Sequence, residues 1–337
     1  MRTMLVRLRV VVAPVLLRGA AVTAARRPAL PRARRGYGRA AAALSDDEGP
    51  SPSPRTAPTP SLGVPVGFLG AGAMGEALLR GMISAGCVTA SQVSVSVRTE
   101  SRKAGLRALG VTAVHGDALQ GGAAAVAAAA DVVILATKPA SFPAVLAALA
   151  PAIDIDRHLI ISIAAGVTLA SMERALPAGA RVVRVMPNTP TRIGAGCSAY
   201  ALGCAATEED GAMADRMLGA VGLALRVDET LMDAVTGLSG CGPAYVFLAI
   251  EALADGGVRQ GLPRDAALAL AAHTVAGAAR MVAETPNTHP ALLREAVCSP
   301  GGATIVGLAE LEDAGVRGAL ARAVGKAAAR ARELSGE

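Results

Sequence analysis

The stretch that decides the fold is VPVGFLGAGAMGEALLRGMISAG, residues 64–86. It has the pattern of a short apolar strand, a glycine-rich turn and a helical run that ends at Gly86. Gly70, Gly72 and Gly75 fit the GxGxxG spacing: the first permits a tight turn, the second lets a pyrophosphate approach, and the third allows close helix packing. The free N–H groups of a helix N-terminus also favour phosphates. We predict a dinucleotide-binding loop; the alternative is a glycine-rich turn in an ordinary α/β unit.

The next predicted strand, residues 92–97, indicates the cofactor. An NAD site usually carries Asp or Glu near the end of this strand to bind the ribose 2′-hydroxyl. Here Ser96, Arg98 and Thr99 stand there instead. A guanidinium among hydroxyls suits a 2′-phosphate. We therefore predict that NADPH is preferred and that NADH can also serve; the alternative is that Arg98 is only solvated.

Further apolar strands are predicted in residues 131–139, 158–163 and 181–186. In open α/β sheets, ligands bind at the carboxyl ends of parallel strands. Small residues follow these strands and leave room for a flat ligand. Lys138 lies in the turn that ends the first of these segments and is interpreted either as a phosphate or ribose contact or as a cation at a helix start.

The second half of the chain changes to Ala- and Leu-rich helical runs, at residues 244–256, 264–284 and 318–334. Between them lies Ser-Pro-Gly-Gly-Ala-Thr, residues 299–304, whose N–H groups and two hydroxyls could hold a carboxylate. The alternative is a tight interhelical turn with Thr304 as a cap. Two or three Ala-rich helices bury each other poorly, so we expect a helical dimer.

Composition divides the chain. Of its 337 residues, 33 are Lys or Arg and 27 are Asp or Glu, and the excess of Arg lies before residue 61. The near-neutral body argues against a nucleic-acid-binding protein. Residues 1–44 contain Arg but no acid, which is typical of a transit peptide, and a Pro- and Ser-rich linker follows. The longest early apolar run, residues 10–17, is too short to span a membrane.

The number and spacing of the cysteines indicate the compartment in which the protein works. Five scattered cysteines with no CxxC favour a reducing compartment and give no metal site. We expect an organellar protein, in the mitochondrion or plastid, or a cytoplasmic one if the extension is not a transit peptide. The predicted divisions are residues 1–63 (transit peptide and linker), 64–228 (Rossmann-like NAD(P)-binding domain) and 229–337 (all-helical dimerisation and substrate domain).

Motifs along residues 66–334 carry a family resemblance. They are VGFLGAGAMGEAL, ATKP at 136–139, SIAAGVT at 162–168, MPNTP at 186–190, DAVTGLSGCGPAY at 233–245, ADGGVRQGLPR at 254–264 and SPGGAT at 299–304. In this order they resemble the pyrroline-5-carboxylate reductases of proline biosynthesis. The resemblance implies a Rossmann-like α/β domain followed by an all-α dimerisation domain. It also implies NAD(P)H-dependent reduction of 1-pyrroline-5-carboxylate to L-proline, in homodimers that commonly assemble into rings of five dimers.

The resemblance also implies a set of site residues. Cofactor contacts would come from Leu69, Gly70, Ala71, Gly72, Ala73, Met74, Ser96, Arg98, Thr99, Ala136, Thr137, Lys138, Pro139, Ile163, Ala164 and Ala165. Substrate contacts would come from Glu229, Ser299, Gly301, Gly302, Ala303 and Thr304. Thr304 would be catalytic, because its hydroxyl would orient or protonate the imine nitrogen. No metal is expected.

Some positions depart from the family pattern and put individual contacts in doubt. They are Gly116 or Asp117 in place of a cofactor-binding Asn, together with Cys241, Asn287, Ala296 and Cys298. Two alternative functions are compared with the sequence. A β-hydroxyacid dehydrogenase would need a catalytic lysine after a Gly-Gly helix start, and Gly256-Gly257 leads to none. A non-catalytic NADP sensor would be favoured by a degraded substrate loop, and residues 299–304 are intact.

Overall fold

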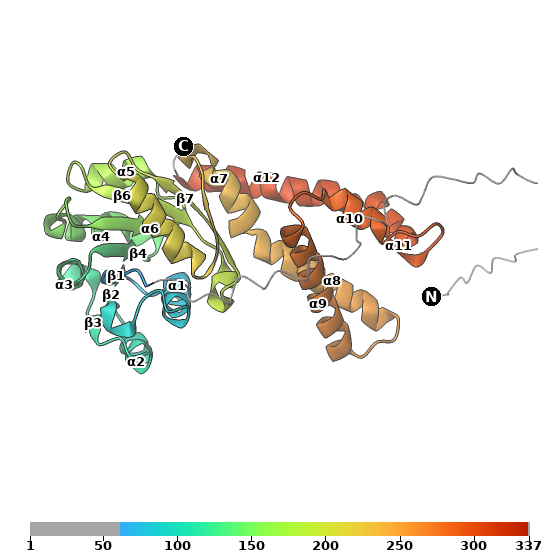
Figure 1. Ribbon diagram of the computed structural model, residues 1–337, viewed down its shortest axis with the longest axis horizontal. Helices are drawn as coiled ribbons and strands as arrows, with labels where there is room; N and C mark the ends of the chain where they lie inside the picture. Colours follow the sequence, from blue (N-terminus) through green and yellow to red (C-terminus); the bar gives the residue numbers. More distant parts are fainter. Residues whose placement is uncertain (1–60, 336–337) are drawn as a thin grey trace, which may run out of the picture. The chain divides into compact units, whose positions relative to one another are not determined.

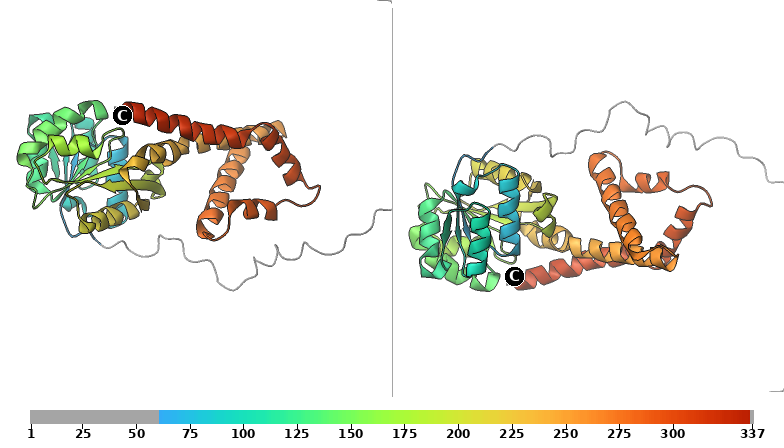
Figure 2. Two further views of the ribbon diagram at one scale, coloured as in Figure 1. Left: turned by 90° about the horizontal axis from the view of Figure 1, so that it is seen from above. Right: turned by 90° about the horizontal axis from the view of Figure 1, so that it is seen from below.

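The computed structural model describes residues 61–335 (Figures 1 and 2). The predicted transit peptide and almost all of the predicted linker lie outside the described residues. The described N-terminal part is built on an eight-stranded sheet in the order β3-β2-β1-β4-β5-β6-β7-β8. Its strands are β1 (Val66–Leu69), β2 (Val93–Ser96), β3 (Ala113–His115), β4 (Val132–Leu135), β5 (Leu159–Ser162), β6 (Arg181–Met186), β7 (Gly196–Leu202) and β8 (Gly222–Arg226).

The first six strands are parallel and have the order of a dinucleotide-binding fold. Strands β1, β2, β4 and β5 are buried at every position, as expected for parallel strands covered on both faces. The covering helices are α1 (Ala73–Ser84), α2 (Glu100–Ala108), α3 (Gly122–Ala129), α4 (Phe142–Leu149), α5 (Leu169–Ala175) and α6 (Glu208–Gly219). Helices α1, α2 and α6 contribute to one apolar core and α3, α4 and α5 to the other. The predicted fold class is confirmed.

The last two strands were not predicted. Strand β7 runs antiparallel to β6, and β8 pairs parallel with β7 at the edge of the sheet. A short helical turn, η6 (Thr189–Ile193), reverses the chain between β6 and β7. At Gly222 φ is +149°, and a Cβ there would collide with the backbone of Gly196. Only glycine therefore fits where these two strands begin.

Short turns of 3-10 helix join the main elements. They are η2 (Ala90–Gln92), η3 (Ala118–Gln120), η4 (Pro139–Ser141), η5 (Ala150–Ala152) and η7 (Glu229–Leu231). Thr168 caps α5 by accepting from the Ser171 N–H, and Thr207 forms a capping box with Asp210 at α6. These caps give the two helices defined starts on the sheet.

The C-terminal part is helical. It contains α7 (Met232–Val235), a π-helical turn η8 (Thr236–Gly240), α8 (Gly242–Arg259), α9 (Arg264–Glu284), α10 (Pro290–Ala296), α11 (Ala303–Asp313) and α12 (Val316–Ser335). Helices α8 and α9 lie side by side (Figure 1) around a small core of Ala254, Ala267 and Ala271. The end of α12 returns to the sheet (Figure 2), where Leu334 lies beside the loop at Gly166.

These helices leave many large apolar side chains exposed. Phe247 is 62% exposed and Leu248 is 67% exposed on α8, and Leu270 and Val306 are similar on α9 and α11. Segments 229–259 and 264–284 are long and apolar enough to cross a membrane by length and composition, and only 11% of an 18-residue apolar window in each is buried within the chain. Many exposed large apolar side chains on adjacent helices are typical of an interaction surface.

Candidate active site

The glycine-rich loop has the geometry that a pyrophosphate needs. Gly70 has φ of +88°, and a Cβ there would lie 2.9 Å from the Ala136 carbonyl oxygen. A Cβ on Gly75 would lie 2.7 Å from the Ala136 Cβ, so α1 packs closely on β4. Gly72 is the N-cap of α1 with no side-chain cap, and a Cβ there would meet nothing nearer than 3.9 Å. The first N–H groups of α1 therefore have no side-chain cap and there is room beside Gly72.

The end of β2 lies against this loop. The Gly70 N–H donates to the Ser96 carbonyl oxygen at 2.9 Å. The Ser96 hydroxyl is buried and donates to the Gly116 carbonyl oxygen at 2.6 Å. Arg98 and Thr99 are exposed, and Thr99 is the N-cap of α2 without a side-chain capping bond. Of the three residues predicted to bind the 2′-phosphate, Arg98 and Thr99 are accessible. The hydroxyl proton of Ser96 is already used in the hydrogen bond to Gly116.

The ends of β4 and β5 supply the next predicted residues. The Ala136 N–H donates to the Leu69 carbonyl at 2.9 Å, and the Ile163 N–H donates to the Leu135 carbonyl at 3.1 Å. These bonds place the three strand ends side by side. The Thr137 hydroxyl oxygen is buried and has no hydrogen-bond partner within residues 61–335. Lys138 is exposed at the start of the η4 turn.

Asn188 joins the sheet to the helical region and was not predicted individually. Its Nδ2 donates to the Ser239 carbonyl at 3.1 Å, and its Oδ1 accepts from the Cys197 N–H at 2.8 Å. Its side chain therefore holds the end of β6, the start of β7 and the η8 turn together. The MPNTP motif was the only sequence signal for this contact.

The second glycine-rich loop, residues 299–304, connects α10 to α11. Gly301 has φ of +67°, and a Cβ on Gly302 would collide with the Ser299 hydroxyl. Gly302 is the N-cap of α11, so the alternative that Thr304 caps this helix is wrong. Thr304 lies in the first turn with its side chain exposed, beside N–H groups that no side chain caps. The loop can therefore present N–H groups and a hydroxyl to a ligand.

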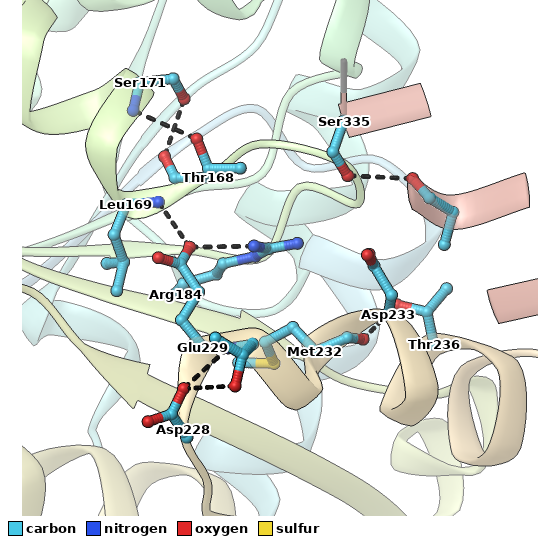
Figure 3. Close-up of polar contacts among 12 residues, drawn as sticks. Thr168, Leu169, Ser171, Arg184, Asp228, Glu229, Met232, Asp233, Thr236 and Ser335 are labelled. Carbon is cyan, nitrogen blue, oxygen red and sulfur yellow. Dashed lines mark hydrogen bonds and ion pairs between the residues drawn. The ribbon is translucent and has the colours of Figure 1, made fainter. Parts of the chain in front are cut away.

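Glu229 stands where the sheet domain meets the helical domain (Figure 3). Its Oε1 accepts from the Leu169 N–H at 2.7 Å and from the Arg184 Nη1 at 2.9 Å. The Arg184 side chain is 8% exposed and that of Glu229 is 30% exposed. Close to Glu229 in the sequence, Asp233 of α7 forms an ion pair with Arg332 of α12, with 3.7 Å between Oδ2 and Nε. Arg184 was missed because an arginine inside a buried strand gives no motif.

A pocket of about 630 Å³ adjoins Glu229. It is lined by α5, the end of β7 and the segment after β8, including Glu173, Cys204, Arg226 and Asp228. None of the predicted cofactor residues and none of residues 299–304 line it. The pocket beside Glu229 thus contains none of the other predicted site residues, and the Oε1 of Glu229 already accepts two hydrogen bonds within the chain. Substrate binding by Glu229 stays a prediction.

The described residues offer neither a cluster of metal ligands nor an activated thiol. Within residues 61–335 no three His, Cys, Asp or Glu side chains gather as a metal site would require. The five cysteines are free. Burial raises the pKa of the Cys87 thiol to about 11 and also raises that of Cys197, so neither is an activated nucleophile.

The glycine-rich loop at the carboxyl edge of a doubly wound sheet is the binding site of a dinucleotide, and such domains are typical of NAD(P)-dependent oxidoreductases. In agreement, the domain family described as "NADP oxidoreductase coenzyme F420-dependent" matches residues 65–166, and "Pyrroline-5-carboxylate reductase dimerisation" matches residues 229–334. The chain belongs to the pyrroline-5-carboxylate reductase family, as predicted.

Named relatives support this membership. The pyrroline-5-carboxylate reductase of Arabidopsis thaliana is 43% identical over 82% of this chain and 98% of its own. That of Methanosarcina acetivorans is 46% identical over 80% of this chain and 97% of its own. Among solved structures, the enzyme of Coxiella burnetii has a TM-score of 0.74 at 34% identity, covering 81% of this chain and 98% of its own. The Plasmodium falciparum enzyme with NADP bound has a TM-score of 0.72 at 28% identity, covering 82% and 100%.

Proposed function

We propose that the chain reduces 1-pyrroline-5-carboxylate to L-proline with NADPH. The observation that carries the proposal is the pair of glycine-rich loops, at residues 70–75 and 299–304, each opening a helix whose first N–H groups lack side-chain caps. One suits a pyrophosphate and the other a carboxylate. The membership in the reductase family supports the same reaction.

The cofactor residues fit a dinucleotide. The open space above Gly72 and the free N–H groups of α1 suit a pyrophosphate, and the exposed Arg98 and Thr99 suit a 2′-phosphate. Ala136–Pro139 and Ile163–Ala165 would line the ribose and nicotinamide. When bound, NADPH would supply the hydride. The chain's own task is to orient both reactants and to exclude water between them.

The substrate loop would act on the protonation state of the imine. An iminium accepts a hydride more readily than a neutral imine, so a proton held at the ring nitrogen favours the reaction. We assign this role to the Thr304 hydroxyl, which is exposed at the first turn of α11. The N–H groups of Gly301–Ala303, with the Ser299 hydroxyl, would anchor the carboxylate. Glu229 would contact substrate only through its second oxygen.

The helical domain is a dimerisation domain, and we propose that the exposed apolar faces of α8 and α9 are buried between two protomers, which then assemble as a pentamer of dimers. We also propose that residues 1–63 act as a transit peptide and linker for a mitochondrion or plastid. The plant relative and the Arg-rich, acid-poor composition of the extension support this proposal.

The test is the loss of NADPH absorbance by the full chain, with and without pyrroline-5-carboxylate, repeated with NADH. We expect substrate-dependent oxidation that is faster with NADPH. Thr304→Ala should lower kcat/KM about 100-fold or more, as expected for loss of a general acid, while Thr304→Ser should retain most of it. Tight NADPH binding without turnover would favour a sensor, and near-normal Thr304→Ala activity would remove the catalytic role.

A further inference from the structure

Arg102 makes a contact that the predicted cofactor residues do not. Its Nη1 donates to the carbonyl oxygen of Ala71, inside the glycine-rich loop. Arg102 is the third residue of α2, and helical side chains lean back toward the helix N-terminus. Its guanidinium therefore lies at the loop, which the Gly70–Ser96 hydrogen bond joins to the end of β2. In dinucleotide-binding folds the adenosine ribose binds at this place.

The charges around Arg102 show that its own charge is uncompensated. Lys103 lies on the same turn, but its ammonium is 2.6 Å from the Glu100 carboxylate. This hydrogen-bonded pair also lowers the pKa of Glu100. Among the described residues, Arg98 and Arg102 have no carboxylate partner, and the hydrogen bond of Arg102 goes to a neutral carbonyl. Two unpaired positive charges therefore flank the end of β2.

Only one of the two hydroxyl groups that the sequence offers at the end of β2 is free to bind a phosphate. Ser96 is 1% exposed and donates its proton to the Gly116 carbonyl, so it cannot donate to a phosphate. Thr99 alone of the two predicted hydroxyl residues keeps an accessible, uncommitted hydroxyl. A 2′-phosphate would need another donor, and a guanidinium with five N–H groups can serve both Ala71 and the phosphate.

We propose that Arg102 is a second selectivity residue for NADPH: it binds the 2′-phosphate together with Arg98 and, through Ala71, couples that phosphate to the pyrophosphate loop. This inference rests on the proposed NADPH site. It assigns the preference for NADPH to a side chain in helix α2, four residues beyond the strand-end arginine.

The test measures binding without turnover. The full chain is titrated calorimetrically with 2′,5′-ADP and with ADP, which share the adenosine and differ in the 2′-phosphate. Arg102→Met should weaken 2′,5′-ADP binding about 10- to 100-fold and ADP binding less than about 3-fold, because charge-assisted hydrogen bonds are lost only to the phosphate. Arg107→Met is the matched control, because Arg107 is also an exposed arginine of α2, and it should change neither affinity.

Three results would overturn the proposal. Equal weakening of both probes by Arg102→Met would make Arg102 only a tether of the loop. Unchanged binding of both probes would make it a solvated side chain. Failure of the unaltered chain to bind either probe would overturn the proposed cofactor site itself. Retained ADP binding by Arg102→Met shows that the variant is folded, so a selective loss cannot come from unfolding.

Discussion

Replacing Glu229 tests whether this residue holds the two domains together or binds substrate. In Glu229→Ala, the Arg184 guanidinium keeps its buried place in β6 but loses its carboxylate, and the Leu169 N–H at the start of α5 loses its acceptor. Breaking a fully buried ion pair costs roughly 3–5 kcal/mol. Because the Glu229 side chain is 30% exposed and water can reach it, we expect about 2–3 kcal/mol of lost unfolding free energy.

The assay is denaturant unfolding at one fixed protein concentration, because association contributes to apparent stability. Glu208→Ala is the matched control: Glu208 pairs with Arg226 at 2.6 Å, but both side chains are exposed, so the loss should stay below about 1 kcal/mol. A loss below about 0.5 kcal/mol in Glu229→Ala would refute the reasoning from burial. If KM for pyrroline-5-carboxylate rises while stability is unchanged, Glu229 is a substrate residue instead.

Three further predictions follow from packing and ionisation. Gly75→Ala places a methyl group against Ala136, so it should cost about 1–3 kcal/mol by denaturant unfolding and weaken NADPH binding; an unchanged midpoint would show that α1 can move away. Burial raises the pKa of Tyr200 to about 12, so the phenol keeps its proton to a higher pH in the folded state than in the unfolded state. The free energy of unfolding should therefore fall between about pH 10 and 12. Tyr200→Phe should make that fall smaller, as unfolding of the two proteins at several pH values would show. Ellman's reagent should modify exposed Cys204 first and buried Cys87 only on unfolding, and Cys204→Ser should abolish the fast phase.

The elements that the sequence predicted best are those with strong periodicity or an obligatory glycine. Residues 181–186 and 264–284 coincide with β6 and α9, since one is a short segment rich in Val and the other a long Ala-rich run. Strands β7 and β8 escaped prediction because small residues dominate the first and much of the second is exposed. Neither segment carries the continuous apolar run of a buried parallel strand.

The site was predictable to the level of loops but not of individual atoms. The positions of Gly70 and Gly75 follow from spacing because their geometry admits no side chain. Whether the Ser96 hydroxyl faces solvent depends on the Gly116 carbonyl beyond β3, which is distant in sequence and brought near only by the sheet. Arg102 was missed for a similar reason, because only the fold brings the first turn of α2 to the Ala71 carbonyl.

The exposed apolar faces of α8 and α9 have a consequence for how the chain matures. A newly made protomer holds a sheet domain with its own core, but its helical half has only a small alanine core. Formation of that half is therefore second order in protein, so its refolding half-time should shorten as concentration rises, whereas the sheet domain should refold at a concentration-independent rate. Until two chains meet, segments 229–259 and 264–284 stay largely exposed although they are as long and apolar as a membrane-spanning helix, and chaperones that bind apolar surface would compete with the second subunit.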